Sequence, residues 1–245
     1  MTEATYRKRR GFRLRVPRRH EAILEDPVLD EILAGACQYS SNLRRRVPLV
    51  STWELQSGPP VHVKYWVPRK AHHRLQLIAR PSKIEREAAQ YARFERAGLP
   101  VADFVFAGVR RLGGAKGIYL TGALATQTVE GATDLRAILQ EGGAEPWEKR
   151  GRDRSGEVLR QVGQLLVRVH RAGLVHGDFM LKNILYCSAT PREPYRLIDL
   201  SSGWPMGEGG DDRAGRARDL VRLICSLARS GLGRAAARCF LESYS

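Results

Sequence analysis

The sequence lacks several features that would assign a chain to a large functional class. Its four cysteines show no Cys-x-x-Cys spacing, so neither a zinc site nor a disulfide framework is indicated, and a reducing cytoplasm fits best. No apolar run approaches the ~20 residues that a helix needs to cross a bilayer. The basic N-terminus is not followed by an apolar core, as a secretory signal would be. Internal repeats and long low-complexity tracts are also missing.

Acidic residues are scarce, at 26 against 41 lysines and arginines, which gives a formal charge of +15. This excess argues for an anionic partner, such as an acidic membrane surface, a nucleic acid or a phosphorylated substrate. Residues 1–20 hold eight of the basic residues and a single acid, Glu3. We interpret them as a basic arm that is either solvated and partly disordered or anion-binding. No nucleic-acid module is recognisable and aromatics are not interleaved with the arm, so no nucleic acid is expected as a partner.

The most informative segment comprises residues 174–186, together with the apolar run at 197–200. It supplies Asp178, Asn183 five positions later, and Asp199 near the end of the run. This is the pattern of a phosphoryl-transfer site. Asp178 would accept a proton from the attacking hydroxyl, and Asn183 and Asp199 would hold the magnesium ions that bridge the phosphates of ATP.

The predicted surroundings support this interpretation. A helical apolar stripe over residues 158–169 has Ser155 as its expected N-cap and Gly173 as its end. A loop, a short strand at 184–186 and a second strand at 195–200 follow, and the second strand delivers an aspartate. That order is expected of a kinase catalytic loop. The alternative is a buried Asp-Asn turn with an unrelated acidic residue after it.

A lysine and a glutamate upstream complete the expected site. A hairpin over residues 47–53 and 61–67 puts Lys64 in mid-strand, and the next helix carries Glu87 within its apolar stripe. A carboxylate on a buried helix face needs a cationic partner, so we predict a Lys64–Glu87 ion pair that grips the α and β phosphates. Two alternatives stay open: Lys64 lies on a solvent face, or Glu95 is the partner.

The expected fold class is α+β, with two lobes. Residues 1–45 would form the basic arm and a short helix interrupted at Pro27. A small antiparallel sheet with one helix would occupy residues 46–125 and grip the ATP phosphates. A mainly helical lobe with the catalytic loop and metal site would occupy residues 126–245, and Ser201–Gly215 would be a loop.

Residues 122–126 are expected to link the two lobes. In that arrangement the backbone of Gly122 and Leu124 would meet the adenine edge of the nucleotide. Asp219, near the start of a late helix, is interpreted as structural and able to accept hydrogen bonds from the catalytic-loop backbone. An ordinary acid in the first turn of that helix is an equally good interpretation.

Taken in order, these pieces resemble the lipopolysaccharide core kinase family, the Kdo and WaaP-type kinases. The resemblance runs from about residue 61 to the end of the chain. It rests on these segments: Val-His-Val-Lys64-Tyr-Trp, Arg80-Pro-Ser-Lys-Ile-Glu-Arg-Glu87, His176-Gly-Asp178 with Asn183, Leu-Ile-Asp199-Leu, and Arg-Asp219-Leu-Val-Arg-Leu. The catalytic-loop motif is shared with RIO-type, aminoglycoside and protein kinases. The helix entry and the Arg-Asp-Leu ending narrow the resemblance to this family.

The resemblance implies a protein-kinase-like fold that uses ATP and Mg²⁺. It also implies phosphorylation of a sugar hydroxyl in the lipopolysaccharide inner core, at the cytoplasmic face of the inner membrane. The chain departs from the pattern in two places. Residues 50–60 contain no Gly-x-Gly-x-x-Gly, and Gly122 stands where the family tends to have glutamate.

Two other functions remain as alternatives. A RIO-like or atypical serine/threonine protein kinase would use the same catalytic residues. The short region after Asp199 lacks the Ala-Pro-Glu segment and the helices that usually build a peptide platform, which favours the sugar kinase. A basic scaffold or nucleic-acid-binding protein with a kinase-like shell is the third interpretation.

Overall fold

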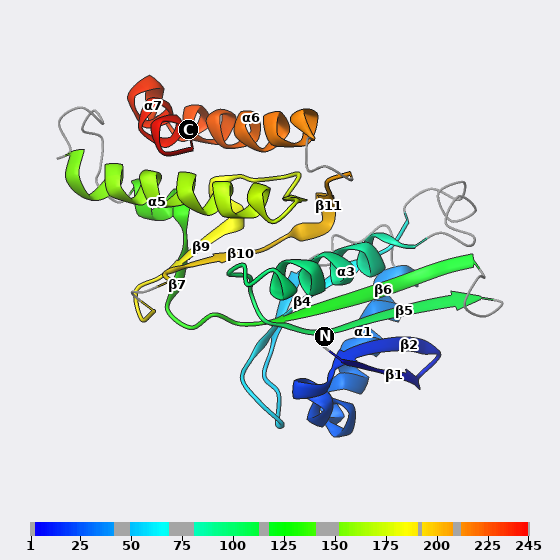
Figure 1. Ribbon diagram of the computed structural model, residues 1–245. Helices are drawn as coiled ribbons and strands as arrows, with labels where there is room; N and C mark the ends of the chain where they lie inside the picture. The colour runs from blue at the N-terminus through cyan, green and yellow to red at the C-terminus, as the bar shows by residue number, and fades with distance from the viewer. Residues whose placement is uncertain are drawn as a thin grey trace. The chain divides into compact units, whose positions relative to one another are not determined.

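A computed structural model describes residues 3–41, 50–68, 81–112, 118–140, 152–190, 193–207 and 212–244 (Figure 1). The chain divides into two compact units. The N-terminal unit comprises Met1–Arg96 and Ala102–Val129, and the C-terminal unit comprises Ala97–Val101 and Glu130–Ser245. Strands dominate the first unit and helices the second, so the fold class is α+β, as predicted. Within the described ranges, no helix is both long and apolar enough to cross a membrane.

The N-terminal unit is built on a six-stranded sheet in the order β1-β2-β5-β6-β4-β3. All neighbouring strands in it are antiparallel. The predicted hairpin is present as β3 and β4, with Val50 opposite Lys64, although residues 47–49 lie outside the described ranges. The strand bounds are β1 Ala4–Arg9, β2 Phe12–Pro17, β3 Val50–Trp53, β4 Val61–Trp66, β5 Phe104–Leu112 and β6 Ile118–Gln127.

The prediction that residues 1–20 form a solvated, partly disordered arm is wrong for the described part of that segment. β1 and β2 form a hairpin whose second strand pairs with β5. Phe12, Leu14 and Val16 are fully buried and alternate with arginines, which is the period-2 pattern of a half-buried strand. Arg10 (φ 46°) and Gly11 (φ 78°) supply the positive-φ turn that joins the two strands. The sequence analysis gave weight to the many basic residues of this segment and missed the alternation of its apolar residues.

Two helices cover opposite faces of the sheet (Figure 1): α1 (Pro27–Ser41) and α3 (Lys83–Arg96). Consecutive strand residues point to opposite faces, and Lys64 and Tyr65 show this directly. Lys64 contacts Glu87 of α3, whereas the Tyr65 hydroxyl lies against Gly35 of α1. Two helices therefore cover the sheet of the N-terminal unit, whereas the sequence analysis predicted a single helix for this sheet.

The N-terminal helix differs from its prediction in its limits. A 3₁₀ segment, η1 (Arg18–Glu25), precedes it, and Pro27 begins α1 instead of interrupting a helix. Proline suits the first helical position because the N–H it lacks would have no intrahelical partner there. Asp26 accepts hydrogen bonds from the backbone N–H groups of Val28 and Ser57, which fixes the start of α1 to the β3–β4 turn.

The C-terminal unit contains four α-helices in its described part and two small sheets, ordered β10-β9-β7 and β11-β8. Its helices are α4 Leu135–Gln140, α5 Arg152–Arg171, α6 Arg213–Arg229 and α7 Gly233–Tyr244. Its strands are β7 Ala132–Asp134, β8 Leu174–Val175, β9 Ile184–Cys187, β10 Tyr195–Leu197 and β11 Trp204–Pro205. Two 3₁₀ turns flank the β9–β10 pair in sequence: η2 (Leu181–Asn183) precedes β9, and η3 (Leu200–Ser202) follows β10.

Helix α5 runs into the predicted catalytic loop. It starts at Arg152, so Ser155 lies in its first turn and is not the N-cap. It ends where predicted, because Gly173 adopts the left-handed conformation (φ 70°) that terminates many helices. Residues 201–215, expected to be a loop, contain the end of η3, strand β11 and the start of α6 in their described part, with 208–211 outside it.

Candidate active site

The predicted ion pair between strand and helix is present in the N-terminal unit. The Lys64 ammonium donates to both carboxylate oxygens of Glu87, each at 3.1 Å. The Glu87 side chain is 2% exposed and that of Lys64 is 22% exposed. Lys64 therefore does not lie on a solvent face, and the pair holds its ammonium at a fixed place on the sheet.

The other two glutamates of α3 have different partners. Ser82 and Glu85 form a capping box: the Ser82 hydroxyl accepts from the Glu85 N–H at 3.2 Å, and the Glu85 carboxylate accepts from the Ser82 N–H at 2.7 Å. Burial is the largest single influence on the pKa of the Glu85 carboxyl and raises it. Hydrogen bonds from Ser82 and the ion pair with Arg111 outweigh burial, so the pKa lies below its usual range. Glu95, the alternative partner for Lys64, binds Arg19 instead, at 2.6 Å.

The prediction that residues 122–126 form a linker, in which Gly122 and Leu124 would meet the adenine edge, is wrong about the linker. Both lie inside β6, which is paired on both sides. Gly122 faces Trp66 and Val109, while Leu124 faces Lys64 and Ala107. Their backbone polar groups are used by these two ladders. The unit boundary falls between Val129 and Glu130, beyond the end of the strand.

In the C-terminal unit, Asp219 of α6 fixes the predicted catalytic loop. Its carboxylate is fully buried and accepts hydrogen bonds from the backbone N–H groups of His176 (2.8 Å) and Gly177 (2.7 Å). α6 starts at Arg213, so Asp219 is well inside the helix and not in its first turn. The prediction that it binds the catalytic-loop backbone is confirmed.

Gly177 is required by both conformation and space. Its φ is +79°, and a Cβ there would meet the Ser202 carbonyl at 1.9 Å. Next to it, His176 is fully buried against the Phe179 ring, and its Nδ1 accepts a long hydrogen bond (3.4 Å) from the Asp178 N–H. Burial lowers the pKa of His176, so the neutral ring supports the loop from beneath.

The loop brings Asp178 and Asn183 together. The Asn183 amide nitrogen donates to the Asp178 backbone carbonyl at 2.8 Å and to its Oδ2 at 3.1 Å. Because the amide nitrogen of Asn183 faces Asp178, the amide oxygen of Asn183 points away from Asp178. These bonds also leave Asp178 Oδ1 on the opposite side of the carboxylate, where the Arg222 guanidinium lies 3.6 Å away.

Asp199 lies at the same end of a strand pair as Asn183. β9 and β10 are antiparallel, with Leu197 opposite Ile184, so the residue before β9 and the residues after β10 are neighbours. The Ile198 N–H donates to the Asn183 carbonyl at 3.0 Å. Asp199 adopts the left-handed conformation (φ 55°), and its Oδ1 accepts from the Ser201 hydroxyl at 2.7 Å.

The donor chemistry of this end fits magnesium. An amide oxygen and a carboxylate are hard ligands, and Mg²⁺ is usually held by one or two carboxylates plus phosphates and water. No group of three or more His, Cys, Asp or Glu side chains gathers as a metal cluster in the part of the chain that is described.

Two residues near the site, Arg222 and His170, carried little signal in the sequence. Arg222 was one arginine among many on a late helix, and only packing brings it to Asp178. His170 of α5 approaches Asp219 at 3.2 Å and the Tyr244 hydroxyl at 2.7 Å, which connects α5, α6 and α7 beneath the loop. From the sequence, His170 is only a basic residue in the last turn of α5, where such residues interact favourably with the helix dipole.

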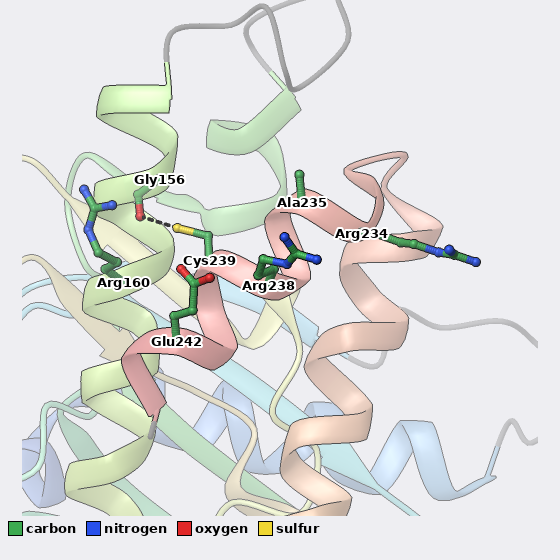
Figure 2. Close-up of a pocket in the computed structure, with 7 residues that line it drawn as sticks. All are labelled: Gly156, Arg160, Arg234, Ala235, Arg238, Cys239 and Glu242. Atoms are coloured by element: carbon green, nitrogen blue, oxygen red, sulfur yellow. Dashed lines mark hydrogen bonds between the residues drawn. The ribbon is translucent and has the colours of Figure 1, made fainter.

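A separate cavity of about 510 Å³ lies between α5 and α7, away from these residues (Figure 2). Across it the Cys239 thiol donates to the Gly156 carbonyl at 3.4 Å. None of the predicted site residues lines it. Its lining comprises Gly156, Arg160, Arg234, Ala235, Arg238, Cys239 and Glu242.

Comparison with known families decides the assignment. The model of the lipopolysaccharide kinase (Kdo/WaaP) family matches residues 40–244, which include Lys64, Glu87, Asp178, Asn183 and Asp199. The chain belongs to the lipopolysaccharide kinase (Kdo/WaaP) family. The match begins at residue 40, so the β1–β2 hairpin, η1 and nearly all of α1 precede it.

Two further similarities agree with this family. A 3-deoxy-D-manno-octulosonic acid kinase of Actinobacillus succinogenes is 33% identical over 132 residues, which are 54% of this chain and 48% of that protein. The chain thus aligns with about half the length of this curated relative. A solved structure described as WaaP in complex with acyl carrier protein covers 89% of this chain and 86% of its own, with a TM-score of 0.55 and 20% identity. That likeness supports the protein-kinase-like fold.

Proposed function

We propose that this protein transfers the γ-phosphate of ATP to a sugar hydroxyl of the lipopolysaccharide inner core, with an octulosonic acid residue as the acceptor. The observation that carries the proposal is the geometry of the predicted catalytic loop. The Asn183 amide orients the Asp178 carboxylate, and the Asp219 carboxylate holds the loop backbone. Membership of the Kdo/WaaP family, and the name of the curated relative, support the sugar acid as acceptor.

In this proposal Asp178 Oδ1 accepts the proton of the attacking hydroxyl. Oδ2 is engaged by the Asn183 amide, so Oδ1 is the oxygen directed away from that bond. Lys64, held by Glu87, neutralises the α and β phosphates, and because its geometry is fixed in advance, little reorganisation is needed at the moment of transfer. Asn183 and Asp199 would hold Mg²⁺, which supplies charge neutralisation on the phosphates when bound.

We also propose that the basic surface of the β1–β2 hairpin holds the protein at the anionic inner face of the inner membrane. Arg7, Lys8 and Arg13 are exposed on this hairpin. Basic residues close to an anionic leaflet gain about 1 kcal/mol each, and a lipid-linked acceptor is presented at that surface.

The test is a transfer assay with labelled ATP and Mg²⁺. Three acceptors are compared: a lipid-linked octulosonic acid, the same lipid without the sugar, and a generic protein substrate. We expect label on the first alone, and its loss with Asp178→Asn. Label on the protein substrate with none on the sugar would favour the atypical protein kinase alternative.

A further inference from the structure

Arg222 lies beside the proposed base, Asp178. Its Nε is 3.6 Å from Asp178 Oδ1, a distance of ionic attraction that is too long for a hydrogen bond. Asp178 is already oriented by Asn183, so it does not need the arginine to hold it. The Arg222 side chain is 45% exposed, and among the described residues this contact is its single ion pair.

The geometry of proton transfer puts the acceptor next to this guanidinium. A hydroxyl that gives its proton to Asp178 must come within about 3 Å of a carboxylate oxygen. Oδ2 is used by Asn183, so the hydroxyl approaches Oδ1, the oxygen that faces Arg222. Substituents that lie a few ångströms from that hydroxyl on the same sugar ring therefore come within reach of the guanidinium.

A second cation and a flat ring lie one helical turn away. Arg218 precedes Arg222 by four residues, so the two side chains are neighbours on the surface of α6. The Arg218 guanidinium lies 5.3 Å from the centre of the Trp204 ring. Trp204 donates to Asp212 at 2.6 Å, which fixes the orientation of the indole. The partly exposed indole and the two arginines thus form a basic surface on one side of Asp178.

We propose that Arg222 is a specificity-determining residue that binds the carboxylate of the acceptor sugar, with Arg218 as the neighbouring cation. This inference rests on the proposed function and names the group through which the acceptor is recognised. A guanidinium suits a carboxylate because its planar N–H donors match the two oxygens in a bidentate pair. A neutral sugar would leave the guanidinium beside Asp178 without an anion from the acceptor.

The experiment pairs two acceptors with four proteins. The acceptors are a lipid-linked octulosonic acid and the same molecule with its sugar carboxylate converted to a methyl amide, so that all lipid phosphates are unchanged. The proteins are the wild type, Arg222→Gln, Arg222→Lys and Arg229→Gln. Arg229 is a matched control, because it is an exposed arginine seven residues further along α6.

For the wild type and Arg229→Gln, we expect amidation to lower kcat/KM by roughly 10- to 100-fold, the size of one hydrogen-bonded charge pair. Arg222→Gln should lose the same factor on the acid, chiefly through KM for the acceptor, and should treat the two acceptors alike. Arg222→Lys should recover part of the preference. KM for ATP should stay unchanged throughout.

Three results would overturn the inference. One is a wild type that ignores amidation. Another is an Arg222→Gln protein that keeps the full preference for the acid. The third is an equal loss of kcat on both acceptors, which would make Arg222 a positioning residue for Asp178. If the wild type phosphorylates neither acceptor, the proposed function itself fails, and the inference fails with it.

Discussion

The Lys64 ammonium lies 3.1 Å from both oxygens of Glu87, and the Asp178 carboxylate accepts from the Asn183 amide. In both pairs one residue orients another whose charge the proposed reaction needs. Because phosphoryl transfer depends on positioning and on electrostatic stabilisation, such fixed pairs would carry most of the catalytic effect in the proposed reaction. Predictions at the scale of single residues therefore concern rates more than stability.

The two aspartates are expected to fail differently. Asp178→Asn removes the proposed base but leaves the metal ligands, so transfer should fall by about 10²- to 10⁴-fold while the nucleotide still binds. Asp199→Asn should instead weaken Mg²⁺-dependent nucleotide binding. Single-turnover transfer and titration with a fluorescent ATP analogue separate the two effects. Wild-type turnover by Asp178→Asn would show that the loop is wrongly assigned.

The ion pair of α3 is tested with a control from the same helix. Lys64→Ala and Glu87→Ala should each lower kcat/KM by about 10²- to 10³-fold, the loss expected for one pre-organised charged group. Glu95→Ala, which removes one of the two acidic partners of Arg19, should keep the wild-type rate. Circular dichroism checks that the variants are folded. Equal losses from the two glutamate variants would mean that α3 acts only through stability.

His176 predicts a pH dependence of stability. Burial holds its pKa below the usual range, whereas the unfolded chain titrates near 6.5. As pH falls below about 6.5, the unfolded state binds the extra proton and the free energy of unfolding decreases. The His176→Asn variant lacks this pH-dependent loss of stability. The difference in free energy of unfolding between the wild type and His176→Asn, measured by urea denaturation, should therefore be smaller at about pH 5.5 than at about pH 7.5. A difference that is independent of pH would exclude a neutral buried ring.

At the scale of elements, each unit uses a helix to hold residues supplied by strands and loops. Helix α3 presents Glu87 to Lys64 of β4, and α6 presents Asp219 to the catalytic-loop backbone. Where a helix begins therefore matters for the site. Ser82 begins α3 with reciprocal hydrogen bonds to Glu85, whereas α5 begins three residues before Ser155.

Two serine substitutions compare these helix starts. Ser82→Ala removes a capping hydroxyl and should lower the free energy of unfolding by about 0.5–2 kcal/mol. Ser155→Ala removes a hydroxyl from inside the first turn and should change stability by less than about 0.5 kcal/mol. Guanidinium denaturation midpoints give both values. A larger cost at Ser155 than at Ser82 would contradict the helix starts described above.

At the scale of the whole molecule, part of the formal charge of +15 belongs to the folded β1–β2 hairpin. The hairpin that holds Arg7, Lys8 and Arg13 also contributes Phe12, Leu14 and Val16 to the core. Deleting residues 1–20 would strip this core and expose the edge of β5. Electrostatic roles of the hairpin are therefore tested by substitution and not by truncation.

We predict that the intact protein sediments with anionic vesicles but not with neutral ones, and that salt releases it. Replacing Arg7, Lys8 and Arg13 by glutamine should weaken this binding by up to about 10²-fold. The control removes an equal charge from the C-terminal unit, with glutamine at Arg160, Arg234 and Arg238. If both triple variants lose the same binding, attraction depends on net charge and not on the hairpin.

The sequence alone determined the elements whose signals are local. The catalytic-loop residues lie within a few positions of one another, the α3 stripe identifies Glu87 as buried, and Gly173 marks a helix end. Glu87 in turn required a cation, since an unpaired buried charge is very costly. The lysine in the preceding strand, Lys64, was the cation that we predicted.

Tertiary structure decided whatever depends on pairing between distant segments. Only the pairing of β2 with β5 shows that the arginine-rich segment is a strand, because this pairing buries the apolar residues that alternate with the arginines. Only the pairing of β6 on both sides shows that Gly122 and Leu124 lie inside a strand and not in a linker. Likewise, Arg222 reaches Asp178 through the packing of α6, a contact across more than forty residues that no local pattern encodes.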